Sequence, residues 1–218
     1  MATASSRPKA ILRIALDAAV QATLDSGEDR TSVKDLGLLN EQWVQSYVGD
    51  AISRHLQAVY GPEKTQPFVT YETNAAWIDY FAAERSSGPY AKGLGDKSRF
   101  DLTVWGRNRT IEGLIEIKDQ PVMETYSRAR DPKKIMAALR KWPNLKWGLF
   151  LFSVRATDHY DDEKMDLHLN NKISKVEGAV SDLDKRFKFT FERQDMKARS
   201  TKCVVWCGVI VRGKDDFY

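Results

Sequence analysis

Two carboxylates and one lysine are the residues of this sequence whose types and spacing could do chemistry. Asp101 is followed, on a later segment, by Glu116 and Lys118, which are separated by a single isoleucine. Carboxylates that face each other can bind a divalent cation, because Mg²⁺ prefers oxygen ligands. An ammonium group beside them can stabilise the negative charge that develops on an attacked phosphate. This chemistry requires that the three side chains lie close together.

A β-hairpin would bring these side chains together. Residues 100–105 and 111–118 alternate in polarity and flank turn residues at 106–109, so they predict two paired strands. A tight turn in that segment places Asp101 opposite Glu116, with Cβ atoms roughly 4.5–5.5 Å apart. The lysine lies two residues further on and shares their face. Like charges in opposed positions normally destabilise a sheet, which indicates a cation site. The other face is apolar and suited to a core, with Leu102, Val104, Gly113, Ile115 and Ile117.

An aspartate followed by Glu-x-Lys on the next strand resembles the motif of the PD-(D/E)xK nuclease superfamily, which has the restriction-endonuclease-like fold. The matching residues are Asp101, Glu116, Ile117 and Lys118, while Phe100 stands where the motif's name has a proline. The resemblance implies a nuclease that uses Mg²⁺, with Mn²⁺ as a substitute. It also implies that Asp101, Glu116 and the Ile117 carbonyl bind the metal, and that Lys118 assists the attacking water. The simpler alternative is a surface hairpin whose Glu116 and Lys118 form an exposed ion pair of little energetic weight.

The elements that must position this hairpin alternate between helical and strand periodicity. Helices are predicted at 8–25, 38–60 and 131–142, with Asp131 as an N-cap, and further strands at 68–72 and 145–154. This predicts an α/β fold with a central mixed β-sheet flanked by helices. From residue 38 to 154 the order matches the αβββαβ core that the resemblance implies. Residues 77–83 fit either a strand or a short helix, and the Gly-, Ser- and Lys-rich run 86–97 predicts a mobile loop.

The C-terminal segment 155–218 is predicted to add one helix and one strand to this core. Apolar residues recur at spacings of three and four from Met165 to Phe187, which predicts a long amphipathic helix. This helix either packs on its own domain or forms an interface with a second copy or a protein partner. An apolar run at 202–212 predicts the last strand. The chain is therefore expected to form a single nuclease-like domain over residues 1–218.

Three further side chains are candidates for the same site. Glu41 lies on the inner face of the helix predicted at 38–60. There it either reaches the metal, as the resemblance implies, or interacts favourably with the helix dipole. Glu72, on the preceding strand, is a second acidic candidate. Gln120 returns to the face of Glu116 and Lys118, where it is a candidate contact for water or substrate.

Basic residues around the hairpin predict contacts with phosphates. These candidates are Lys97, Arg99, Arg107, Arg109, Arg130, Lys133 and Lys134. The net charge of +4 and the pI near 8.9 suit a nucleic-acid partner, and DNA is the expected substrate. Trp105 and Tyr90 are expected either in the core or stacked on a base. A catalytically silent nuclease-like domain that binds nucleic acid or a protein partner is the alternative function.

The sequence offers little support for other catalytic motifs, for a disulfide or for a secreted or membrane protein. The three histidines are far apart in the sequence, and it contains no glycine-rich phosphate loop. Cys203 and Cys207 would lie about 13 Å apart on one strand at ~3.3 Å per residue, which is too far for a disulfide. The sequence shows no signal peptide and no run of transmembrane length, so we expect a cytoplasmic protein that does not associate with membranes.

Overall fold

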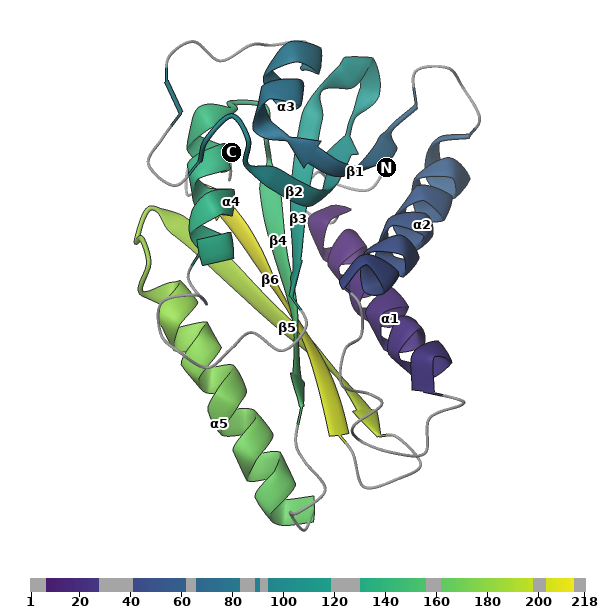
Figure 1. The fold of residues 1–218 in the computed structure, drawn as a ribbon, viewed down its shortest axis with the longest axis vertical. Helices are drawn as coiled ribbons and strands as arrows, with labels where there is room; N and C mark the ends of the chain where they lie inside the picture. The colour runs from purple at the N-terminus through teal and green to yellow at the C-terminus, as the bar shows by residue number, and fades with distance from the viewer. Residues whose placement is uncertain are drawn as a thin grey trace.

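The chain builds a mixed β-sheet that is covered by helices on both faces (Figure 1). The computed structural model describes residues 7–27, 41–61, 66–82, 89–90, 94–118, 130–155, 162–197 and 203–213. Its sheet has the strand order β1-β2-β3-β4-β6-β5, in which β3 and β4 run parallel and the other neighbours run antiparallel. The predicted α/β class with a mixed sheet is confirmed. The strands are β1 (Phe68–Asn74), β2 (Arg99–Trp105), β3 (Ile111–Lys118), β4 (Trp147–Arg155), β5 (Phe187–Lys197) and β6 (Cys203–Gly213).

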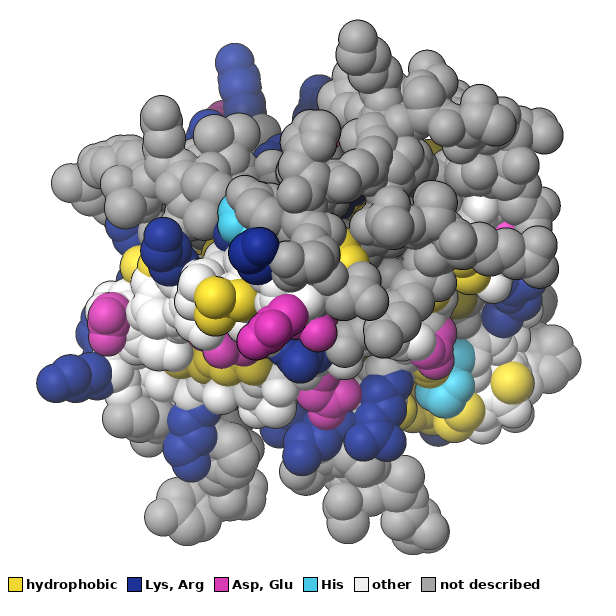
Figure 2. Space-filling model, turned by 90° about the horizontal axis from the view of Figure 1, so that it is seen from below, with side chains coloured by type: hydrophobic (Ala, Val, Ile, Leu, Met, Phe, Trp, Pro, Cys, Tyr) yellow, Lys and Arg dark blue, Asp and Glu magenta, His cyan; other side chains and the backbone are white. Residues whose placement is uncertain are grey.

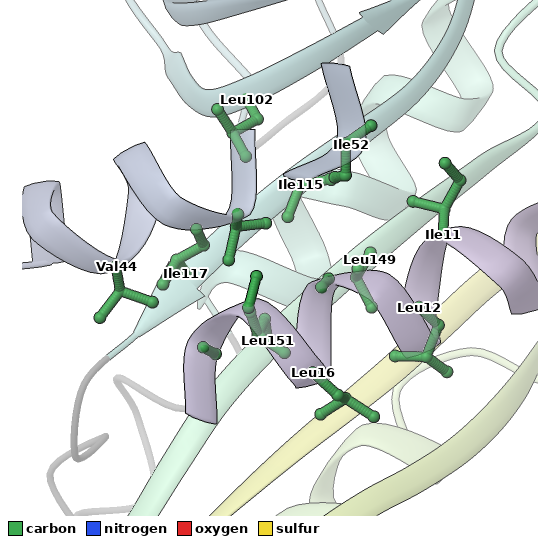
Figure 3. Packing of buried hydrophobic residues seen from close by; sticks show 14 of the residues in the cluster. Ile11, Leu12, Leu16, Val44, Ile52, Leu102, Ile115, Ile117, Leu149 and Leu151 are labelled. Atoms are coloured by element: carbon green, nitrogen blue, oxygen red, sulfur yellow. The ribbon is translucent and has the colours of Figure 1, made fainter. Parts of the chain in front are cut away.

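Helices α1 (Arg7–Gly27) and α2 (Glu41–Tyr60) cover one face of the sheet. Their buried residues meet the apolar face of the hairpin and β4, as Figure 3 shows for Ile11, Val44, Leu102, Ile115 and Leu149. The other face is covered by α3 (Ala75–Phe81), α4 (Arg130–Lys141) and α5 (Asp162–Ser181). The hairpin is thus enclosed from both sides, which fixes the direction of every side chain along its strands. Among the described residues, no helix has the length and apolar character needed to cross a membrane.

The hairpin has the predicted register over most of its length. Leu102 pairs with Ile115, and Val104 pairs with Gly113. The register shifts by one residue between Val104 and Trp105, next to a short 3₁₀ turn at Arg107–Arg109 in which Asn108 and Arg109 both have a φ of 60°. Since the shift lies near the turn, the pairing towards the open end of the hairpin is unchanged. Asp101 and Glu116 therefore occupy opposed positions there.

Strand β1 extends the hairpin on its outer side and continues into α3. The strand is two residues longer than predicted and ends at Asn74, whose side chain caps the helix by accepting a hydrogen bond of 2.8 Å from Trp77 N. Of the segment 77–83, which fits two structures by sequence, residues 77–81 belong to this helix, residue 82 is its C-cap and residue 83 lies outside the described residues. The loop predicted at 86–97 lies partly outside the described residues, namely at 86–88 and 91–93. The last helix before β4 starts at Arg130, so Asp131 lies in its first turn and is not the predicted N-cap.

The C-terminal region differs from its prediction. Helix α5 ends at Ser181, and Phe187 begins β5, a strand that was not predicted. The segment after residue 155 therefore adds one helix and two strands. The apolar stripe of α5 packs against the sheet of its own chain, where Leu169, Ile173 and Val180 are buried. This confirms the first of the two interpretations of that helix, and the homodimer or protein-partner interface remains untested.

Candidate active site at the open end of the β2–β3 hairpin

Asp101 and Glu116 lie at the same end of the sheet, because β2 begins where the antiparallel β3 ends. Asp101 Oδ2 accepts a hydrogen bond of 2.6 Å from the backbone N–H of Ile117, the residue that follows Glu116. This contact links the aspartate side chain across the strand pair to the neighbour of the second acid. Glu116 itself is buried, with 4% of its surface exposed. The structure thus brings the two predicted carboxylates together.

Burial perturbs both carboxyl groups, and neighbouring acidic groups reinforce the effect. Burial raises the pKa of Asp101 to about 6, although the hydrogen bond from Ile117 and the charge of Lys134 oppose the rise. Burial also raises the pKa of Glu116 well above its ordinary range, where Lys134 opposes the rise and Asp101 reinforces it. Two acids that are desolvated and close enough to repel each other favour either a proton or a nearby cation. The arrangement is costly unless one of these is present.

Lys134 of α4 supplies one such cation. Its Nζ lies 2.7 Å from Glu116 Oε1 and donates a hydrogen bond of 2.6 Å to the carbonyl of Arg99. The contact with Glu116 is an ion pair in which the buried Oε1 receives no well-aligned hydrogen bond. Sequence analysis placed Lys134 among the phosphate-binding residues, but the structure places it against the carboxylate. This ion pair is hard to predict from sequence, because Lys134 and Glu116 lie on different elements that meet only when α4 packs on the sheet.

Lys118 and Glu41 form a second ion pair at the same end of the sheet. Lys118 Nζ lies 2.6 Å from Glu41 Oε1, and both side chains are 43% exposed. Partial burial lowers the pKa of Lys118, but the hydrogen bond and charge of Glu41 outweigh it and raise the pKa. Glu41 therefore faces the lysine. Within the described residues, no three His, Cys, Asp or Glu side chains are grouped so that they could hold a metal ion.

Glu72 of β1 and Gln45 of α2 connect their elements to the candidate active site around Asp101 and Glu116. In the register of β1 and β2, Glu72 falls opposite Asp101, but its φ of 49° interrupts the strand pairing there. Its Oε1 accepts a hydrogen bond of 3.2 Å from Gln45 Nε2, which also donates to the carbonyl of Asp101. Sequence reasoning missed Gln45. Its position one turn after Glu41, beside buried Val44, was a signal that it faces the same way.

The other predicted residues lie at the hairpin turn, have exposed side chains or fall outside the described residues. Arg107 and Arg109 lie at the hairpin turn, at the opposite end of β2 and β3 from Asp101. Four predicted basic residues, Lys97, Arg99, Arg130 and Lys133, have exposed side chains. On the face seen in Figure 2, the described Lys and Arg side chains are interspersed with Asp and Glu. Gln120 lies outside the described residues.

The two aromatic residues singled out by sequence take structural positions. Trp105 is 3% exposed, and its indole N–H donates a hydrogen bond of 2.8 Å to Thr70 Oγ1. The hydroxyl of Tyr90 donates a hydrogen bond of 2.6 Å to Asp79 Oδ2. Comparison with known proteins adds no assignment, since no family model, curated protein or solved structure matches the chain.

Proposed function

We propose that this protein is a Mg²⁺-dependent nuclease that hydrolyses phosphodiester bonds in DNA. One observation carries the proposal: half-buried Asp101 and buried Glu116 occupy opposed positions, desolvation raises the pKa of both, and the strand that carries Glu116 also carries Lys118. Two desolvated acids side by side are costly to ionise, and a bound cation would offset that cost. The proposal gives this pair a function.

The arrangement of elements supports the same proposal. Helix α2, strands β1, β2 and β3, helix α4 and strand β4 follow one another in the order αβββαβ, with the short α3 inserted after β1. This is the order that the resemblance to the PD-(D/E)xK superfamily implies. The parallel pair β3 and β4 is connected through α4, which also delivers Lys134 to Glu116. The elements that form the αβββαβ core therefore also carry the residues of the candidate active site.

The residues at the centre fit a magnesium ion through two carboxylates. Mg²⁺ is commonly bound by one or two carboxylates and completes its shell with water and substrate oxygens. Asp101 and Glu116 would hold the ion, with the Ile117 carbonyl as the further ligand that the family resemblance implies. The desolvation of both carboxyl groups supports this fit, because a cation would offset the cost of ionising them. When bound, the ion supplies Lewis acidity and an activated water.

The protein's own residues then have separate tasks. The N–H of Ile117 and the amide of Gln45 hold Asp101 in place from two sides. Lys118 can leave its half-exposed partner Glu41 and stabilise the charge that grows on the attacked phosphate. Lys134 offsets the charge of Glu116, from a position where burial restricts its movement. Orientation and charge stabilisation are thus distributed over four elements.

Cleavage of DNA by isosteric variants tests this proposal. Wild-type protein should cut DNA with Mg²⁺ or Mn²⁺ and stop when EDTA is added. Asp101→Asn and Glu116→Gln should abolish cutting, because each removes a charged ligand while keeping the shape of the side chain. Glu112→Gln is the matched control: Glu112 lies on the same strand but pairs with Arg7 at 2.6 Å, away from the centre. Cutting by both centre variants at the wild-type rate would refute the assignment.

A catalytically silent nuclease-like domain is the second candidate. It is favoured by one observation, that Lys134 and Lys118 pair with Glu116 and Glu41 and so offset charge at the site from within the protein. Thermal unfolding with and without Mg²⁺ separates the candidates. An enzyme that binds the ion at Asp101 should gain stability on adding Mg²⁺, and the Asp101→Asn variant should not. A silent domain should show no such difference between the two proteins.

A further inference from the structure

A cavity of about 490 Å³ is lined by residues of β1 and α3 together with Trp105 and Arg109. This volume falls within the ~300–1,000 Å³ typical of ligand sites. The strand β1 is an edge of the sheet, so the cavity opens along a side that no other described strand covers. Aromatic rings from β1, α3 and the end of β2 form most of its wall, and Glu72 and Arg109 also line it.

The rings are arranged in two stacked pairs, each with an exposed member. Phe68 stacks on Trp105 with ring centroids 5.9 Å apart and planes at 13°, and Trp77 stacks on Phe81 at 4.7 Å and 18°. Phe68 and Trp77 are 42% and 56% exposed, respectively. Trp105 is buried and held by its hydrogen bond to Thr70. The buried ring of the first pair is therefore fixed, while Phe68 and Trp77 present apolar surface to solvent.

The two ends of the cavity have different chemistry. Phe68 pairs with Trp105 near the hairpin turn, where Arg109 provides a guanidinium group. At the other end Glu72 falls opposite Asp101, and Gln45 donates hydrogen bonds to the carboxylate of Glu72 and to the carbonyl of Asp101. The lining of the cavity thus includes a basic group, Arg109, aromatic rings, and Glu72, the residue that falls opposite Asp101 in the strand register.

We propose that this cavity holds the bases of a single nucleic-acid strand whose phosphate enters the centre at Asp101 and Glu116. The proposal rests on the proposed nuclease function and names its substrate class, which is single-stranded DNA or a single-stranded extension of a duplex. Aromatic side chains stack on any base, whereas the bases of a duplex are already stacked on each other and cannot reach such a wall. Arg109 is placed to contact a phosphate further along the strand.

A peptide strand added to the β1 edge is the competing occupant, and the backbone of β1 disfavours it. Strand addition requires a continuous row of backbone donors and acceptors along the edge. Glu72 has a φ of 49°, a left-handed conformation that interrupts this row in the second half of the strand. The side chains beside it, in contrast, offer ring faces and a guanidinium, which suit bases and phosphates.

Binding of fluorescent oligothymidylate and of a blunt duplex, measured in Ca²⁺ to limit cutting, tests the inference. Trp77→Ala should weaken binding of the single strand by about 5- to 100-fold, the range expected for loss of one stacked base, and leave duplex binding unchanged. Trp77→Phe should retain most of the affinity. Phe68→Thr, at the other stacked pair, should give a similar loss. Tyr80→Leu is the matched control, because Tyr80 lies on the same helix, is 69% exposed and does not line the cavity.

The outcomes separate this inference from the proposed function. If Trp77→Ala and Phe68→Thr bind the single strand as well as wild type, or if wild type binds no single strand, the inference is wrong, whatever the Asp101→Asn assay shows. If both variants lose single-strand binding but wild-type protein never cuts, the inference holds and the nuclease proposal fails. Equal loss of duplex and single-strand binding would also contradict it, because the cavity would then not select single strands.

Discussion

Two lysine–glutamate pairs lie at the same end of the sheet with nearly the same separation and very different surroundings. Lys134 and Glu116 are 2.7 Å apart, with side-chain exposures of 17% and 6%. Lys118 and Glu41 are 2.6 Å apart, and each is 43% exposed. The first pair joins α4 to β3, and the second joins β3 to α2. Distance alone does not distinguish them, but access to water does.

The difference indicates which lysine can take part in a reaction. An exposed pair contributes about 0–1 kcal/mol, so Lys118 can leave Glu41 at little cost when a substrate phosphate is present. A buried pair is much harder to break, because the partner left behind is an uncompensated charge. Lys134 is therefore suited to hold the centre together, and Lys118 to act in the transition state. The predictions below test this division of tasks.

The largest expected effect is on catalysis and concerns Lys118. Lys118→Ala should lower kcat by two to four powers of ten, about 3–5 kcal/mol, because its charge acts mainly when negative charge grows on the phosphate. Lys118→Arg should restore little, since a broad guanidinium cannot replace a compact ammonium group. Single-turnover cleavage at saturating Mg²⁺, with DNA binding measured in parallel, separates chemistry from affinity. A variant that loses activity only through loss of DNA binding would show that Lys118 is a binding residue.

The next largest effect is on stability and concerns Lys134. Lys134→Met should lower the free energy of unfolding by about 3 kcal/mol at pH 7, because it leaves buried Glu116 without its counter-charge. Lys118→Met, at the exposed pair, should cost less than about 1 kcal/mol. Urea unfolding of both variants measures the contrast. Adding Glu116→Gln to Lys134→Met should recover much of the loss, and equal costs at the two lysines would remove the basis of the comparison.

The smallest effect concerns Asp101 and depends on pH. The pKa of Asp101 is raised from its ordinary value of 3.8 to about 6 in the folded protein, so the folded state binds this proton more tightly than the unfolded state. Its contribution to stability is therefore most favourable below pH 4 and is lost as the pH rises to 6. Asparagine does not ionise, so the Asp101→Asn variant keeps the stability that the wild type loses as Asp101 ionises. The variant should therefore be more stable than the metal-free wild type by about 1–3 kcal/mol above pH 6.

Unfolding of the Asp101→Asn variant and of the wild type at pH 4 and pH 8 measures this dependence. The two proteins should differ little at pH 4, where wild-type Asp101 is protonated in the folded state. A difference of the same size at both pH values would mean that the substitution acts through packing and not through charge. Saturating Mg²⁺ should reduce the advantage of the variant at pH 8, because the ion then offsets the charge of Asp101.

The hairpin could be predicted from sequence because its signals are local. Alternation in residues 100–105 and 111–118 together with turn residues between them set the register, and the face of Asp101 and Glu116 follows from it. The shift near Trp105 did not matter for the site because it lies at the turn. The partners of the acids, in contrast, come from helices that the sequence does not place. Gln45 was therefore missed, and Lys134 was predicted to contact phosphate and not Glu116.

Strand β5 could not be separated from the helix before it by spacing alone. Leu183 and Phe187 are four residues apart, a spacing that fits both one face of a helix and one face of a strand. The alternating Phe187, Phe189 and Phe191 were the available signal for a strand, but the helical spacing of apolar residues continues to Phe187 and overlaps it. Packing resolves the ambiguity, because these residues join the cluster between α5 and the sheet.

The position of β6 has a consequence for synthesis of the protein. β4 lies in the middle of the sheet, between β3 and β6, but among the described strands β6 is the last to leave the ribosome. Until residues 203–213 emerge, β4 keeps one edge without a partner, and its residues Phe150, Leu151 and Phe152 belong to the buried core of the finished protein. Such an edge can pair with other chains. The nascent chain therefore passes through an interval in which this unpaired edge exposes it to aggregation.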